Sequence, residues 1–314
     1  MEVLDLPLAP RAPDEPTPLD ESVWLALPPL DARREAAALP LDTRFQLRSF
    51  ITPVQWAFLQ EHGFIVFARV ASPEEVATIL AEMDRVETKL LCEGIDRIYG
   101  VPVWFGRNTE GEPWLQRMGF SSVYSNYLRD FVQDARFEPI RRLIGENARI
   151  GLREKDGVVF NRYINAPGSL RPNLAWHTDA LLDVFYNGRM PGPMLNVGLH
   201  FDRIRPEDGG LRLLPGTHTQ STWSTLFRKI HFVTNDDDPD EIPVETWPGD
   251  LTVHDGRMWH RVKASPHDGP RSIRRSMYVP YVIDAYQPKD EQTGTRAYMK
   301  VFDVVMRWKA RRKR

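Results

Sequence analysis

Trp176-His177-Thr178-Asp179 is the stretch around which this chain is organised. It follows a loop with two prolines and a glycine between residues 167 and 172 and precedes another loop, so it lies near a strand end. In an extended segment, side chains two positions apart point to the same face. His177 and Asp179 therefore place an imidazole and a carboxylate side by side, which is two-thirds of a facial metal site.

A second pair with the same spacing, His200-Phe201-Asp202, competes with the first. His200 ends a longer apolar strand, and Asp202 runs into an arginine-rich segment where a turn or an ion pair explains its carboxylate. We therefore favour the first pair for metal binding.

The third ligand should be a histidine on another strand, and two candidates lie close together after residue 250. His260 follows a glycine-containing turn and begins a new segment between Trp259 and Arg261. His254 lies earlier, in a strand beside Asp255, where hydrogen bonding to a turn is a sufficient explanation. His260 is therefore the favoured third ligand.

The chemistry of such a site depends on its neighbours. Two imidazoles and one carboxylate on one face of an octahedral ion suit non-haem Fe(II) oxygenases, although zinc hydrolases use similar ligands. Arg274 and Arg275 follow His260 by about fourteen residues, and a buried arginine can bind a carboxylate through two parallel hydrogen bonds. This pair favours an oxygenase that uses a dicarboxylate cosubstrate.

Composition sets the broad class of the protein. The chain has 314 residues, 42% of them hydrophobic, which is enough for a sizeable core. The net charge of −2 favours neither nucleic acid nor an anionic membrane surface as a partner, and the basic segment 307–314 is interpreted as a solvated helix end. Cys92 is the only cysteine, so a metal must use His, Asp or Glu. No apolar run approaches 18 residues and no leader is visible, so we expect a cytoplasmic protein.

The order of the segments predicts one domain that is mainly β with flanking helices (α+β). Residues 1–45, rich in proline and acidic groups, are expected to be flexible or draped over the domain of residues 46–314. A helical layer is expected at about 50–150, a jelly-roll core at about 151–285 and a C-terminal helix at about 296–310. The expected segments are helices at 53–62 and from 73, mostly helix at 114–143, an aromatic loop at 99–106, and strands at 64–67, 158–164, 194–201, 211–214, 250–254 and 272–283.

Five motifs in this order resemble the phytanoyl-CoA dioxygenase family of Fe(II)- and 2-oxoglutarate-dependent oxygenases over roughly residues 50–285. They are the entry Thr52-Pro53 to Val66 with Ser72-Pro73-Glu74-Glu75, the central Trp176-His177-Thr178-Asp179, Glu207-Asp208-Gly209-Gly210 to His218, Pro248-Gly249-Asp250, and Gly256 to Arg261 with Arg274-Arg275-Ser276.

The resemblance implies a double-stranded β-helix (jelly roll, cupin-like) core in which iron is bound by His177, Asp179 and His260. Because Asp179 fills the place that a halide would need, the resemblance favours hydroxylation or a related oxidation over halogenation. It also implies that His218 is architectural.

The resemblance further implies a cosubstrate site. Arg274 would bind the distal carboxylate of 2-oxoglutarate, with Arg275 as the alternative because neighbouring side chains of a strand alternate between faces. Asn161 and Asn196 occupy strand positions that line the cosubstrate in relatives. Val262 departs from the family, where a small hydroxyl residue is common.

The expected activity is the O2-dependent oxidation of an unactivated C–H bond of a small organic substrate, with release of succinate and CO2. Ascorbate is the expected reductant in vitro. Trp104-Phe105 and the segment 182–186 are candidate walls of the substrate site. Two alternatives are a cupin-like metal enzyme that does not use 2-oxoglutarate and a non-catalytic jelly-roll binding protein. The substrate and the oligomeric state do not follow from the sequence.

Overall fold

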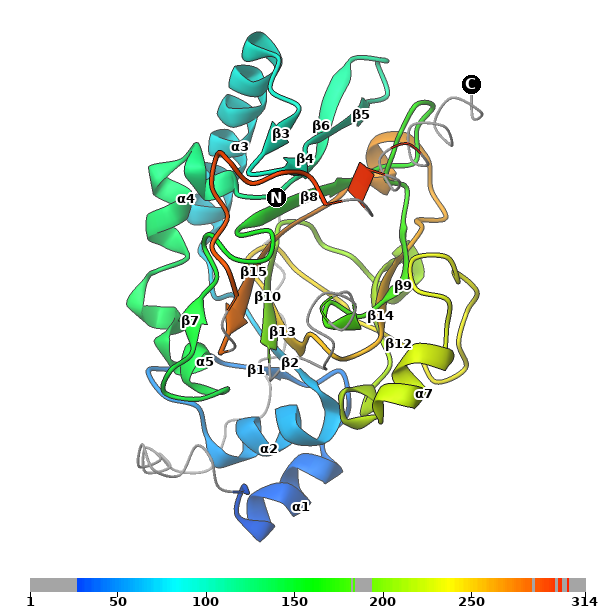
Figure 1. The fold of residues 1–314 in the computed structure, drawn as a ribbon. Helices are drawn as coiled ribbons and strands as arrows, with labels where there is room; N and C mark the ends of the chain where they lie inside the picture. The colour runs from blue at the N-terminus through cyan, green and yellow to red at the C-terminus, as the bar shows by residue number, and fades with distance from the viewer. Residues whose placement is uncertain are drawn as a thin grey trace.

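The computed structural model describes residues 27–181, 183, 194–283, 286–296, 299, 300 and 304. Within these residues two sheets face each other as a jelly roll, with helices outside (Figure 1). The larger sheet has the order β1-β2-β13-β10-β15-β8-β6-β5, and β7 pairs with β15. Its strands are β1 Arg44–Phe45, β2 Phe64–Phe67, β5 Trp104–Arg107, β6 Pro113–Met118, β7 Arg149–Ile150, β8 Val159–Tyr163, β10 Met194–His200, β13 Leu251–Asp255 and β15 Arg274–Val282.

The smaller sheet, with the order β12-β11-β14-β9, carries two of the expected metal ligands. A separate hairpin pairs β3 with β4. Together these strands are β3 Arg97–Ile98, β4 Val101–Pro102, β9 Leu174–His177, β11 Gly210–Leu213, β12 Ile242–Pro243 and β14 His260–Lys263. The expected jelly-roll core is therefore confirmed.

The helices pack outside the sheets. They are α1 Leu30–Ala38, α2 Pro53–His62, α3 Pro73–Glu93, α4 Asn126–Phe131, α5 Glu138–Arg142 and α7 Thr222–Phe227. The predicted starts of α2 and α3 are confirmed, because Thr52 and Ser72 each close a capping box over a proline at the first helical turn. Helix α2 ends at Gly63, whose φ of 79° is the left-handed conformation that glycine adopts without strain.

The two faces of the larger sheet differ in polarity. On β15 the side chains of Met277, Val279 and Tyr281 point outward and form, with Phe131 and Phe137 of the α4–α5 region, part of the apolar core. Alternation sends Arg274, Ser276 and Tyr278 to the inner face, toward the smaller sheet. The outer face thus supplies packing energy, about 1.5–3 kcal/mol for each fully buried large apolar side chain, and the inner face is left for polar chemistry.

Two segments of the helical layer were predicted wrongly. Residues 113–118 form strand β6 instead of a helix, and residues 99–106 contain β4 and β5 instead of a loop. Leu115 and Met118 suggested a helix because they are three positions apart, which in a strand places them on opposite faces. Both are fully buried, because this part of the sheet is covered on both sides.

The two ends of the chain are described only in part. From residue 27 the N-terminal segment packs onto the domain, since α1 contacts α2 and β1 pairs in parallel with β2. The division of the chain at residue 45 stays a prediction, and residues 1–26 lie outside the described residues. Most of the predicted C-terminal helix, 296–310, also lies outside them. Among the described residues no helix is long and apolar enough to span a membrane.

Candidate metal centre

His177, Asp179 and His260 meet at the end of the smaller sheet. Strands β9 and β14 are antiparallel, and His177 pairs directly with His260 in the register, so their rings lie 4.1 Å apart. Asp179 follows two residues after His177; its Oδ2 is 3.5 Å from Nε2 of His260, and its Oδ1 is 4.0 Å from Nε2 of His177. One ligand atom from each residue lies within 4.8 Å of the other two, which is compatible with a single metal ion.

Backbone carbonyls orient both imidazoles. Nδ1 of His177 lies 2.9 Å from the carbonyl oxygen of Ala175, and Nδ1 of His260 lies 3.0 Å from that of Met258. These contacts assign the N–H to Nδ1 and leave the Nε2 lone pair directed at the centre, the usual arrangement of histidine ligands. Burial, with the neighbouring histidines, holds the pKa of His177 well below its usual value. The ring is therefore neutral near pH 7, as metal binding requires.

Asn196 fixes the carboxylate of Asp179. It lies on β10 of the larger sheet, and its Nδ2 donates to Oδ2 of Asp179 at 2.5 Å. Lys155 donates to the backbone carbonyl of Asp179 at 3.0 Å. Asn196 thus contacts the carboxylate of a proposed metal ligand, and the role that the family resemblance implied for it, lining the cosubstrate, stays a prediction.

His254 belongs to the site, and its interpretation as a turn residue was wrong. Asp255, not His254, caps the turn, by accepting from the backbone N–H of Arg257 at 2.8 Å. His254 lies opposite Asn196 in the register and faces inward; its ring is 4.6 Å from that of His260. Among the described residues neither of its ring nitrogens has a hydrogen-bond partner. Strict alternation from Thr252 along β13 would have indicated this orientation.

The two arginines of β15 point in opposite directions. Arg274 is on the inner face, 4% exposed, and donates to the carbonyl oxygens of Ser272 and Pro172 at 3.2 and 2.7 Å and to that of Lys263. Within the described residues it forms no ion pair. Burial lowers its pKa to about 10, so it stays charged at neutral pH.

Arg275 forms an ion pair on the opposite face of the strand. Its guanidinium pairs with the carboxylate of Asp202, with N–O distances of 2.6 and 3.2 Å. This contact confirms the expected ion pair of Asp202, and it places Arg275 away from the inner face. The alternative cosubstrate role of Arg275 is therefore not supported by its orientation.

Asn161 lies on the inner face as well. Direct register partners run across the larger sheet from Trp104 through Arg117, Asn161 and Ser276 to His200. His200 contacts the Thr252 hydroxyl at 3.0 Å, so its imidazole forms a hydrogen bond inside the roll and is not part of the metal triad. This row of side chains forms the floor on which a cosubstrate could lie.

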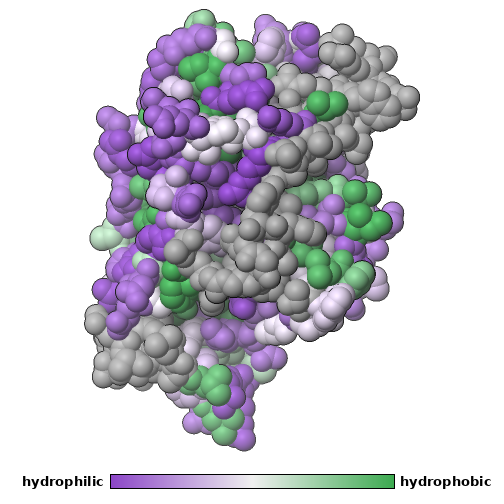
Figure 2. All heavy atoms as spheres, viewed as in Figure 1, coloured by the Kyte–Doolittle hydropathy of each residue, from purple (hydrophilic) through white to green (hydrophobic). Residues whose placement is uncertain are grey.

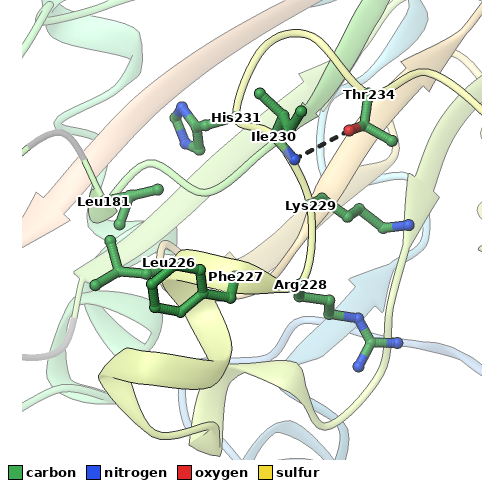
Figure 3. Close-up of a pocket in the computed structure, with 8 residues that line it drawn as sticks. All are labelled: Leu181, Leu226, Phe227, Arg228, Lys229, Ile230, His231 and Thr234. Carbon is green, nitrogen blue, oxygen red and sulfur yellow. Dashed lines mark hydrogen bonds between the residues drawn. The ribbon is translucent and has the colours of Figure 1, made fainter.

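A pocket of about 470 Å³ lies against α7 and the loop that follows it (Figure 3). Its lining includes Leu181, Phe227, Ile230 and His231. Among these lining residues His231 is close to the triad, because its ring is 6.1 Å from that of His177 and its Nε2 accepts from the backbone N–H of Thr178 at 2.9 Å. No spacing rule pointed to His231 in the sequence. It reaches the site only because the loop after α7 folds back onto β9.

Apolar side chains surround the mouth of this pocket. Trp223 and Phe227 stack with ring centres 5.6 Å apart, and both are more than two-thirds exposed, as are Ile230 and Val233. Figure 2 shows hydrophobic atoms gathered at the right of the molecule, over this region. Trp104, a candidate wall of the substrate site, is buried on β5 and does not line this pocket, and most of the segment 182–186 lies outside the described residues.

The fold and the site together define a jelly-roll protein with a His-Asp-His group that could hold a metal ion. A family model described as phytanoyl-CoA dioxygenase (PhyH) matches residues 59–275. The chain therefore belongs to the phytanoyl-CoA dioxygenase family, as its motifs indicated.

The chain is also similar to other proteins. The dioxygenase af480 of Aspergillus fumigatus is 25% identical over 251 residues, which cover 77% of this chain and 71% of that protein. The epimerase SnoN of nogalamycin biosynthesis, solved with Fe3+, alpha ketoglutarate and nogalamycin RO, is 20% identical with a TM-score of 0.55, covering 78% of this chain and 87% of its own. HygX of Streptomyces hygroscopicus, solved with nickel and 2-oxoglutarate, is 17% identical with a TM-score of 0.55, covering 80% and 94%. At these identities the two solved structures bear on the fold alone.

Proposed function

We propose that this protein is an Fe(II)- and 2-oxoglutarate-dependent dioxygenase that hydroxylates, or otherwise oxidises, an unactivated C–H bond of a small organic substrate. One observation carries the proposal. A buried arginine without a carboxylate partner among the described residues, Arg274, lies in the same interior as the His-Asp-His triad. A zinc hydrolase needs the triad but has no use for the buried cation.

The residues take the following roles in this proposal. His177, Asp179 and His260 hold the iron through two Nε2 atoms and one carboxylate oxygen, and Asn196 keeps that carboxylate in place. Arg274 binds the distal carboxylate of 2-oxoglutarate. Bound iron, together with the cosubstrate and O2, would supply the oxidising power for C–H cleavage, with succinate and CO2 as by-products.

The protein itself positions the reactants and excludes water from the site. Both histidines and Arg274 are at most 5% exposed, so water is largely excluded from the interior and charge interactions there are strong. The pocket beside His231 is large enough for a small organic molecule. We propose that it receives the substrate, with the stacked rings of Trp223 and Phe227 at its entrance. A cytoplasmic location stays a prediction.

The test is cosubstrate turnover by the purified protein with Fe(II), ascorbate and 2-oxoglutarate. We expect Fe(II)-dependent succinate and CO2 formation, which His177→Ala and His260→Ala abolish. His267→Ala is the matched control, because His267 is partly exposed and pairs with Asp208 outside the site. Absence of both turnover and Fe(II)-dependent 2-oxoglutarate binding would refute the proposal.

The same assay separates the rival functions. A metal enzyme that does not use 2-oxoglutarate would keep its activity when Arg274 becomes Ala, and a binding protein with a vestigial site would form no succinate under any condition. SnoN is an epimerase, so the products formed from candidate substrates decide between hydroxylation and other oxidations.

A further inference from the structure

Two buried arginines lie against one tyrosine ring at the end of the interior that holds Arg274. Tyr163 on β8 is the direct register partner of Arg274, and its ring centre is 5.6 Å from the guanidinium carbon of Arg274. Arg171, in the loop before β9, lies 4.9 Å from the same ring. Its Nη2 donates to the Tyr163 hydroxyl at 2.8 Å.

This group has an excess of positive charge. Arg171, Tyr163 and Arg274 are each at most 4% exposed, and neither arginine forms an ion pair with a carboxylate among the described residues. Nε of Arg171 also lacks a hydrogen-bond partner there. Burial lowers the pKa of both guanidinium groups. Buried charges without a counter-charge are costly, so the arrangement is suited to a bound anion.

The Tyr163 hydroxyl has one hydrogen bond to give. Its oxygen accepts from Arg171, and its own hydrogen has no acceptor among the described residues. A hydroxyl that accepts from a cation is polarised and becomes a stronger donor. The face that Tyr163 shares with Arg274 is the inner one, so a carboxylate held by Arg274 is the acceptor that this hydrogen lacks.

Arg171 is itself held rigidly. Its backbone N–H lies 3.2 Å from both Oε1 of Gln116 and Oγ of Ser169, and its guanidinium stacks 5.1 Å from the ring centre of Trp104. Because Arg171 is held in one conformation, it can hold the Tyr163 side chain in one orientation. Its contact with Tyr163 is therefore a built feature of the site and not a surface association.

We propose that Arg171 is a positioning residue of the cosubstrate site, which orients and polarises the Tyr163 hydroxyl so that Tyr163 and Arg274 together bind the distal carboxylate of the 2-oxo acid. The inference rests on the proposed function. It adds that selectivity for a dicarboxylate over a monocarboxylate comes from three residues and not from Arg274 alone.

The test compares two 2-oxo acids of equal chain length on the anaerobic Fe(II)-loaded protein. 2-Oxoglutarate has the distal carboxylate and 2-oxopentanoate lacks it. Binding of both is measured for the wild type, Arg171→Gln, Tyr163→Phe and the double variant. Arg203→Gln is the control, because Arg203 also stacks on an aromatic ring, that of Trp247 at 3.8 Å, but is exposed.

We expect Arg171→Gln and Tyr163→Phe each to weaken 2-oxoglutarate binding about tenfold or more, with less than about a twofold effect on 2-oxopentanoate. The double variant should be no weaker than the worse single variant, because Arg171 acts through Tyr163. Arg203→Gln should change neither affinity.

Two outcomes would overturn the inference. Equal weakening of both acids by Arg171→Gln would mean a purely structural role, and additive losses in the double variant would mean that the two residues act separately. Arg171→Lys, which keeps the charge, and Tyr163→Phe keep the test open should Arg171→Gln fail to fold. If the wild type shows no Fe(II)-dependent binding of either acid, the proposed function itself fails, which is a distinguishable result.

Discussion

Asn196, on the larger sheet, donates a hydrogen bond to the proposed metal ligand Asp179. Among the described residues, the Asn196 amide is the side chain that donates a hydrogen bond to the Asp179 carboxylate. Without this hydrogen bond the carboxylate should be free to rotate. We expect Asn196→Leu to weaken Fe(II) binding about 10- to 100-fold, the usual cost of losing a hydrogen bond to a metal ligand. Anaerobic metal titration of the folded variant measures this. Unchanged affinity would mean that the backbone alone orients Asp179.

His254 is a single residue of the site that is expected to lower the stability of the metal-free fold. Its buried ring nitrogens are without hydrogen-bond partners among the described residues, and replacing such a group by an apolar one is close to neutral or stabilising. We expect the metal-free His254→Leu protein to unfold in urea at the same or a higher denaturant concentration than the wild type.

His200 provides the control for that experiment. It is also buried on the inner face, but its Nε2 is 3.0 Å from the Thr252 hydroxyl. His200→Leu should therefore cost about 1 kcal/mol or more of unfolding free energy. A loss for His254→Leu as large as that for His200→Leu would show that His254 stabilises the apo fold.

At the scale of elements, α3 is joined to β8 and β6 by one buried carboxylate. Glu87 pairs with Arg162 of β8 and accepts from the backbone N–H of Leu115 at 2.6 Å. We expect Glu87→Ala to lower the unfolding free energy by about 3 kcal/mol, because it leaves a buried guanidinium with only the exposed Asp84 as partner. Glu93→Ala on the same helix breaks an exposed pair with Lys89 and should cost far less. Urea denaturation of both variants checks the difference.

The helices and strands also show which elements could be predicted from local sequence signals. Capping residues and terminal glycines located α2 and α3 because these signals act within a few residues. Strand β6 was missed because its burial on both faces comes from partners far along the chain, including Asn161, which pairs with Arg117. Local spacing cannot report that kind of burial.

At the scale of the whole molecule, the proposed ligands bridge the two sheets. Metal binding joins β9 and β14, and the cosubstrate would join this centre to Arg274 on β15. Ligands that bind only the folded state stabilise it by about 2.7 kcal/mol at 100 times Kd. We therefore expect Mn(II) to raise Tm, and 2-oxoglutarate to raise it further only when Mn(II) is present.

Two variants separate the Tm rise caused by Mn(II) from the additional rise caused by 2-oxoglutarate. Arg274→Gln should keep the Tm rise with Mn(II) and lose the additional rise with 2-oxoglutarate, and His260→Ala should lose both. Thermal unfolding measured by circular dichroism tests this. An additional rise that persists in Arg274→Gln would place the cosubstrate elsewhere.

The sequence by itself determined what is local: that His177 and Asp179 share a face, that Arg274 and Arg275 point in opposite directions, and that the core is a roll of short strands. Only the tertiary structure decided which arginine faces inward, that His254 and His231 join the centre, and that Arg171 meets Tyr163. The reason is physical. Orientation along one strand follows from its two-residue period, but which strands face each other, and in which register, is set by packing between segments that are distant in the chain.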